Sequence, residues 1–230
     1  MAQLPAMDLL IFDLDGTLID SKLDLAHAVN ATRAHFGLSP LDLETVGNYI
    51  GNGAPVLIRR AMGAEASQAD VDKALEFFLA YYGDHKLDNT RAYPGIPEAL
   101  EALHQDSVRM AVLTNKPVRI SGRIIEGLGL SKYFLHVYGG NSFDRKKPDP
   151  LGVETLLAET GVPKERTLMV GDSAVDVQTA RNAGVKVCGV TYGFQPESFA
   201  ADPPDMIVDR PEELARAVIA ERKSRGVIES

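Results

Sequence analysis

The chain has 230 residues and a formal net charge of −8, from 24 lysines and arginines against 32 aspartates and glutamates. An acidic surface disfavours nucleic acids and anionic membranes, so we expect neither as a partner. The single cysteine, Cys188, excludes an internal disulfide and is typical of a reducing cytosol, and no apolar run is long enough for a signal sequence or a membrane span. We therefore expect a cytoplasmic protein. Composition leaves open whether it is a monomer or a homodimer.

Short apolar segments that alternate with helical patterns predict the strands of a parallel sheet. Each is rich in Val, Ile or Leu and is followed by Gly, Asp, Asn or Thr, as is typical of buried parallel strands. They are Leu9–Phe12, Val108–Leu113, Phe134–Tyr138, Thr167–Val170, Val185–Val190 and Met206–Val208. The alternation predicts an α/β fold with a Rossmann-like parallel sheet.

One long stretch interrupts this alternation with helical patterns and no convincing strand. The predicted helices are one that begins after Asp20 or Ser21 and runs to His35, then Leu41–Ile50, Ala54–Met62 and Ala69–His85. Residues 90–95 are interpreted as the return linker. The prediction is an all-helical cap domain at residues 20–87, inserted into a catalytic core formed by residues 1–19 and 88–230.

Two carboxylates, Asp13 and Asp15, follow the first predicted strand. In an extended chain they would project to the same side, about 6.6 Å apart along the strand. Their repulsion would be relieved by a magnesium ion, which prefers carboxylate oxygens, and Gly16 would let the chain turn sharply. The alternative is a plain turn with solvated acids.

Polar residues also follow the second strand and a later loop. Thr114 and Asn115 offer a hydroxyl and an amide that can donate to phosphate oxygens, although a capped loop would use the same residues. In Lys146-Lys147-Pro148, the proline disfavours helical geometry at the residue before it and could aim one lysine inward as a fixed ammonium. The alternative is a solvated basic turn.

A second acidic pair follows the strand predicted at Thr167–Val170. Asp172 could complete a magnesium site with the first pair, and Asp176 could anchor the inward lysine. The alternative is that Asp172 or Ser173 caps the following helix, and both interpretations can hold together. The positions of all these groups predict one phosphate-handling site with a nucleophile, a proton donor, a cation and metal ligands.

At this point the sequence closely resembles the haloacid dehalogenase superfamily. The four motifs of that superfamily match Asp13–Thr17, then Thr114, then Lys147, and finally Gly171–Ser173 with Asp176. The helical insert stands where that superfamily places its cap. The resemblance covers nearly the whole chain and implies a phosphotransferase.

The resemblance also implies a role for each residue. Asp13 would attack phosphorus and form an aspartyl-phosphate, and Asp15 would protonate the leaving alkoxide and then activate water. Magnesium would be held by Asp13, Asp172 and the backbone carbonyl of Asp15. The phosphoryl oxygens would be bound by Thr114, Asn115 and Lys147, and Asp176 would orient Lys147 or a metal-bound water, with Ser173 beside it.

A narrower resemblance is to phosphatases that act on 2-phosphoglycolate. It rests on Tyr49–Ala54, Thr114–Pro117, Lys146–Pro150 and Thr191–Gly193. Gly51, Asn52 and Gly53 precede a predicted helix, so their N–H groups could bind a substrate carboxylate, or the segment could be a plain turn.

Other activities remain alternatives to 2-phosphoglycolate hydrolysis. They are a phosphatase of sugar or amino-sugar phosphates, a phosphomutase, and a non-catalytic binding module. A dehalogenase or a phosphonate hydrolase would lack the second acid of the first motif, and Asp15 argues against both.

Overall fold

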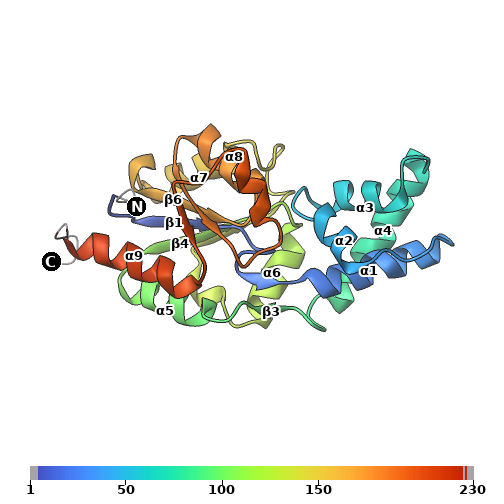
Figure 1. The fold of residues 1–230 in the computed structure, drawn as a ribbon, viewed down its shortest axis with the longest axis horizontal. Coiled ribbons are helices and arrows are strands. Elements are labelled where there is room, and N and C mark those ends of the chain that lie inside the picture. The colour runs from blue at the N-terminus through green and yellow to red at the C-terminus, as the bar shows by residue number, and fades with distance from the viewer. Residues whose placement is uncertain (1–4, 225, 227–230) are drawn as a thin grey trace.

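A computed structural model describes residues 5–224 and 226 of the chain (Figure 1). Within this part, six parallel strands form one sheet in the order β5-β4-β1-β6-β7-β8. They are β1 (Leu9–Phe12), β4 (Arg109–Leu113), β5 (His136–Tyr138), β6 (Thr167–Gly171), β7 (Lys186–Val190) and β8 (Met206–Val208). The predicted parallel α/β sheet is confirmed, and β5 begins two residues later than expected.

Helices cover both faces of this sheet. Helices α5 (Ile96–Gln105), α6 (Val118–Gly127) and α9 (Pro211–Ser224) lie on one side in Figure 1, and α7 (Leu151–Thr160) and α8 (Ala174–Ala183) lie on the other. Successive side chains of a strand point to opposite faces, and β1 follows this rule. Leu10 and Phe12 belong to the larger apolar cluster, whereas Leu9 and Ile11 pack in the second cluster with residues of α7 and α8. Strand β1 is therefore buried on both faces, at the centre of the core.

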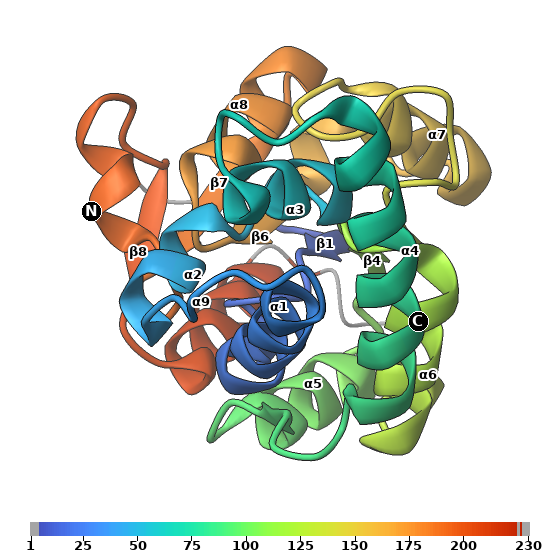
Figure 2. The ribbon, with the colours of Figure 1, turned by 90° about the vertical axis from the view of Figure 1, so that its right-hand side faces the viewer.

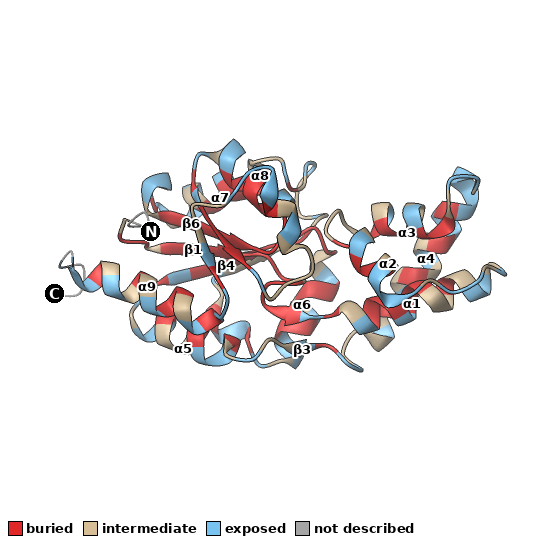
Figure 3. Cartoon of the chain, in the orientation of Figure 1, coloured by how far each residue is buried: buried red, intermediate tan, exposed pale blue. Residues whose placement is uncertain are grey.

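The stretch between β1 and β4 forms a separate group of helices beside the sheet, called the helical insert below. It contains α1 (Lys22–His35), α2 (Leu43–Tyr49), α3 (Ala54–Met62) and α4 (Gln68–His85), with α1 packed along α4 (Figures 1 and 2). Buried residues line the inner faces of these helices and exposed residues the outer faces (Figure 3). The four predicted helices are present, each within two residues of the expected bounds at either end.

The two connections to the helical insert run side by side as a short antiparallel ribbon of β2 (Ile19–Asp20) and β3 (Arg91–Ala92). Two-residue strands carry no periodicity, so the sequence pattern predicted only a linker for the second connection. Among the described residues, no helix is both long and apolar enough to cross a membrane.

Asp24, in the first turn of α1, holds the second connection in place. One of its carboxylate oxygens accepts from the Thr90 backbone N–H and hydroxyl at 2.8 Å each, and the other accepts from the Asn89 side-chain amide at 2.8 Å. The Asn89 backbone N–H lies 3.0 Å from both oxygens. Burial alone would raise the pKa of Asp24, but these hydrogen bonds bring it below its usual value. The ionised carboxylate therefore stabilises the fold.

Asp24→Asn is expected to lower the free energy of unfolding by about 2–3 kcal/mol at pH 7, since an amide cannot accept all these bonds and its NH₂ faces other donors. Because the folded-state pKa is lowered, this contribution is present at neutral pH. It should be lost as the pH falls below about 4. Urea unfolding from pH 7 downward measures it. Asp42→Asn, at the exposed N-cap of α2, is the control and should cost far less, because asparagine also caps helices. Equal effects of the two changes would contradict this role.

Candidate active site

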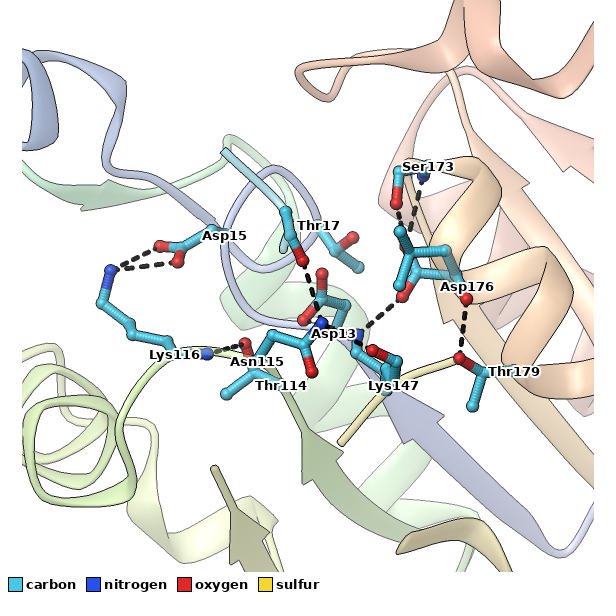
Figure 4. A network of polar contacts seen from close by, with 12 residues as sticks. Asp13, Asp15, Thr17, Thr114, Asn115, Lys116, Lys147, Ser173, Asp176 and Thr179 are labelled. Carbon is cyan, nitrogen blue, oxygen red and sulfur yellow. Dashed lines mark hydrogen bonds and ion pairs between the residues drawn. The ribbon is translucent and has the colours of Figure 1, made fainter. Parts of the chain in front are cut away.

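The residues singled out by sequence meet at the carboxyl ends of the central strands. In the sheet, β1 lies between β4 and β6, so the loops that follow these three strands are neighbours. Asp13 follows β1, Thr114 follows β4 and Asp172 follows β6. The loop before α7 brings Lys147 beside Asp13 and Thr114 (Figure 4). The edge beyond the carboxyl ends of parallel strands is where open α/β sheets bind ligands.

Lys147 is the buried cation of this site. Its Nζ lies 2.9 Å from Asp13 Oδ1 and 2.7 Å from Asp176 Oδ1, and the residue is 4% exposed. The two acids raise the pKa of Lys147 despite the opposing effect of burial, so the ammonium stays charged. Of the two adjacent lysines, Lys147 points inward, while Lys146 donates to the Asn52 carbonyl at 2.7 Å.

Asp13, Asp172 and Asp176 form a buried acidic cluster. Each offers a carboxylate oxygen, and these three atoms lie within 4.8 Å of one another. Burial raises the pKa of Asp13 to about 6 although Lys147 lowers it, and burial with Asp176 and Asp13 raises the pKa of Asp172 well above its usual range. Three carboxylates against the single ammonium of Lys147 leave an excess of negative charge. A divalent cation would relieve that excess, so the donor set fits a metal such as Mg²⁺.

Asp172 is held in this cluster by its neighbours. The Phe194 backbone N–H donates to its Oδ2 at 2.6 Å, and the Thr17 hydroxyl lies 3.4 Å from its Oδ1. Gly16 has φ +81°, and a Cβ there would lie 2.2 Å from Asp172 Oδ2. Only glycine allows the loop after β1 to approach this carboxylate so closely.

Asp176 contacts the inward lysine as expected, and it also takes part in helix capping, which the sequence assigned to Asp172 or Ser173. Its Oδ2 accepts from the Ser173 hydroxyl at 2.9 Å and from the Ser173 backbone N–H at 3.2 Å, which closes the first turn of α8. Its Oδ1 meets Lys147. Helix capping therefore fixes the carboxylate that positions the lysine.

Asp15 lies apart from the acidic cluster. The chain does not stay extended after β1, because the Gly16 N–H donates to the Ile19 carbonyl and Asp15 forms an isolated bridge with Ile19. The Asp15 carboxylate instead accepts from Lys116 Nζ at 2.9 and 3.0 Å and from the Ser21 hydroxyl at 2.5 Å. The expected extended chain is therefore wrong, but both carboxylates still line one cavity, which is described below. That the backbone carbonyl of Asp15 binds metal stays a prediction.

Lys116 is a site residue to which the sequence pattern assigned no role. It is 5% exposed, and its Nζ lies 4.5 Å from the ring centroid of Tyr82 in α4. Burial alone would lower the pKa of Lys116, but Asp15 and Tyr82 raise it to about 12. The sequence offered one indication that Lys116 belongs to the site, its position two residues after Thr114. Its partners come from the loop after β1 and from the helical insert, and no local pattern links them.

Asn115 has a different task from the one expected. Its side-chain NH₂ donates to the Gly51 carbonyl and to the Lys147 carbonyl, both at 3.0 Å. Both amide hydrogens are therefore used, and the expected donation from this amide to phosphate is not available in this structure. Asn115 instead ties the helical insert to the core. Thr114, predicted beside it, is buried and lines the cavity described below.

The turn at Gly51, Asn52 and Gly53 is fastened to the core through its carbonyl groups. Asn115 binds the Gly51 carbonyl and Lys146 binds that of Asn52. Gln195, in the loop after β7, adds hydrogen bonds from its amide to the carbonyls of Gly47 and Ile50, at 3.2 and 3.1 Å. Anion binding by N–H groups of this turn stays a prediction.

A cavity lies between the core and the helical insert, over Asp13. Asp13, Asp15, Thr114 and Lys116 form its polar side, and the insert contributes mostly apolar side chains, Leu25, Ile50, Leu57, Phe78, Leu79 and Tyr82. A ligand whose phosphate meets Asp13 and Lys147 would therefore place the rest of its structure under the helical insert.

Comparison with known proteins gives consistent matches over most of the chain. Residues 10–190 match the model of the haloacid dehalogenase-like hydrolases. A phosphoglycolate phosphatase of Pseudomonas fluorescens is 41% identical over 214 residues, covering 90% of this chain and 77% of that protein. One of Agrobacterium fabrum is 37% identical over 229 residues, covering 98% of each.

Solved structures agree with these sequence matches. The crystal structure of a predicted phosphoglycolate phosphatase from Haemophilus somnus superimposes with a TM-score of 0.87 at 33% identity, covering 92% of this chain and 97% of that one. The family match extends from β1 through β7 and so includes Asp13, Thr114, Lys147, Asp172 and Asp176. The chain therefore belongs to the haloacid dehalogenase-like hydrolase family.

Proposed function

We propose that the chain is a magnesium-dependent phosphoric monoester hydrolase that acts on a small phosphorylated metabolite, with 2-phosphoglycolate as the leading substrate. The observation that carries this proposal is the position of Asp13. Its carboxylate contacts the Lys147 ammonium, belongs to the acidic cluster, and lines the cavity under the helical insert. A nucleophile, a phosphate-neutralising cation and an enclosed space for a leaving group meet at this one side chain.

The proposed chemistry has two steps. An Asp13 carboxylate oxygen attacks phosphorus and forms an aspartyl-phosphate, while the P–O bond to the alkoxide breaks and Asp15 gives a proton to the departing oxygen. A water molecule then loses a proton to Asp15 and attacks the aspartyl-phosphate. The Asp13–phosphate linkage breaks, inorganic phosphate leaves, and both acids return to their starting state.

The surrounding charges support both steps. Lys147 reduces the repulsion between the Asp13 carboxylate and the phosphate dianion, and Asp176 holds the ammonium where the phosphoryl oxygens would lie. Asp172 and Asp13, with the predicted carbonyl of Asp15, would hold Mg²⁺. That ion supplies positive charge that stabilises the developing negative charge on the phosphoryl oxygens.

The choice of substrate rests on the cavity and on the relatives. The curated relatives named above are phosphoglycolate phosphatases. The insert side of the cavity is mostly apolar, which suits a short leaving group and offers few partners for the hydroxyls of a sugar. A sugar or amino-sugar phosphate is therefore the weaker candidate, for a phosphatase and for a mutase alike.

The test is a screen of purified protein with Mg²⁺ against phosphorylated metabolites, ranked by kcat/KM from phosphate release. We expect 2-phosphoglycolate to rank above glucose 6-phosphate and glucosamine 6-phosphate, and EDTA to abolish the release. A protein that releases no phosphate from any ester would refute the proposal. A sugar phosphate that is isomerised without phosphate release would point to a mutase instead.

A further inference from the structure

We propose that Lys116 binds a carboxylate on the leaving group of the substrate and so makes the site selective for small anionic phosphate esters. This inference rests on the proposed phosphatase function and deepens it. Neither the acidic cluster nor Lys147 accounts for Lys116. In Figure 4, Lys116 and Lys147 lie on opposite sides of Asp13, and Lys116 lines the cavity.

The charge of the cavity lining points to this role. Among the described residues that line it, Lys116 is the basic one, and most of the remaining wall is aliphatic or aromatic. An ammonium in such surroundings interacts with an anion through a low effective dielectric, so its selectivity for charge is strong. A neutral leaving group would gain nothing comparable from it.

The position of Lys116 relative to Asp15 sets which part of a substrate it can reach. Lys116 Nζ lies 2.9 Å from Asp15 Oδ1, and Asp15 is the proposed proton donor to the departing oxygen. In 2-phosphoglycolate a single CH₂ group separates that oxygen from the carboxylate carbon. When the departing oxygen lies at Asp15, the carboxylate would therefore lie within reach of Lys116, which contacts Asp15.

The Lys116 ammonium can also donate a hydrogen bond to a further ligand. It carries three N–H donors, and the hydrogen-bond acceptors that the structure gives it are the two oxygens of Asp15. The Tyr82 ring backs the charge at 4.5 Å and limits where the side chain can move. The Tyr82 hydroxyl is buried at the same wall, and burial raises its pKa to about 12, so it remains neutral there.

The competing location for a substrate carboxylate is the N-terminus of α3 at Gly53. That turn lines the same cavity, but its fixed contacts to the core run through the carbonyls of Gly51 and Asn52. The two locations predict different mutational results, because only one of them depends on the Lys116 ammonium.

The experiment compares 2-phosphoglycolate with 2-hydroxyethyl phosphate, in which a neutral CH₂OH replaces the carboxylate. We expect wild-type kcat/KM to favour 2-phosphoglycolate by about 10- to 100-fold, the range of one charge-assisted hydrogen bond. Lys116→Met should remove most of this preference, mainly through KM. Any effect of the change on Asp15 reaches both substrates, so the ratio of the two kcat/KM values isolates carboxylate binding.

Lys146→Met is the matched control, since it removes a neighbouring lysine that contacts the insert but does not line the cavity. It should leave the ratio unchanged even if both rates fall. Lys116→Arg, which keeps the charge, should retain a preference. A wild-type ratio near one overturns the inference without any variant. An unchanged ratio in folded Lys116→Met, with 2-phosphoglycolate still hydrolysed by the wild type, overturns it while the proposed function stands. Wild-type protein that hydrolyses neither ester overturns both.

Discussion

Asp13→Asn is expected to abolish phosphate-ester hydrolysis, with kcat reduced by about 10⁴-fold or more, the scale on which removal of a covalent nucleophile acts. An amide oxygen is a poor nucleophile, and the rest of the site cannot replace it. Asp15 is paired with Lys116, and Asp172 and Asp176 are fixed by Phe194, Ser173 and Lys147. The measurement is phosphate release under saturating substrate and Mg²⁺, on protein whose mass is verified.

The same substitution should leave the fold intact and stabilise the metal-free protein. Burial raises the pKa of Asp13 to about 6, so the charged form is disfavoured in the folded state. A carboxyl with a raised pKa contributes its full stability below the unfolded-state pKa and loses it as the pH rises through 6. In EDTA at pH 8, the free energy of unfolding of Asp13→Asn, measured in urea, should therefore equal or exceed that of the wild type, by up to about 3 kcal/mol. This difference between the two proteins should shrink toward zero as the pH falls to 4.

Two outcomes would contradict these roles of Asp13. Substantial magnesium-dependent turnover by folded Asp13→Asn protein would remove the nucleophile role. A large loss of stability at pH 8 in EDTA would mean that the carboxylate holds the loops together, rather than being held by them against its own repulsion.

The core of the fold could be predicted because its strands carry strong local signals. Leu9–Phe12 and Met206–Val208 were placed to the residue, since a short apolar run between turn residues is typical of a buried strand and too short for a buried helix. The ribbon of Ile19–Asp20 with Arg91–Ala92 could not be, because it depends on a contact between segments some 70 residues apart and on no pattern within either.

Site residues could be predicted where the end of a strand places them. They were harder to predict where their position depends on a contact with another element. Asp13 and Asp172 meet because β1 and β6 are adjacent. Asn115 turned to the Gly51 carbonyl, and Lys116 gained its role from Asp15 and Tyr82. These contacts form only when the helical insert packs on the core. No residue spacing in the sequence predicts how the two pack together.

Lys147→Met is expected to affect stability and activity together. The substitution keeps the length of the side chain but leaves Asp13 and Asp176 without the ammonium that lies 2.9 and 2.7 Å from them. Breaking a buried ion pair by removing one partner costs about 3–5 kcal/mol, and we expect a loss of this size in EDTA at pH 8. Loss of the fixed charge beside the phosphoryl group should also lower kcat by about 10³-fold.

Magnesium separates an electrostatic cause from a simple packing defect. An ion that binds the folded acidic cluster stabilises the fold by mass action, so Tm should rise with Mg²⁺ in the wild type. It should rise further in Lys147→Met, where the three carboxylates lack any cation. The control is Lys186→Met, whose lysine is exposed and paired with Asp205 at 2.9 Å, and which should cost less than about 1 kcal/mol. If Lys147→Met were as stable as this control in EDTA and gained no more from Mg²⁺ than the wild type, the acidic cluster would not carry the uncompensated charge that the proposed metal site requires.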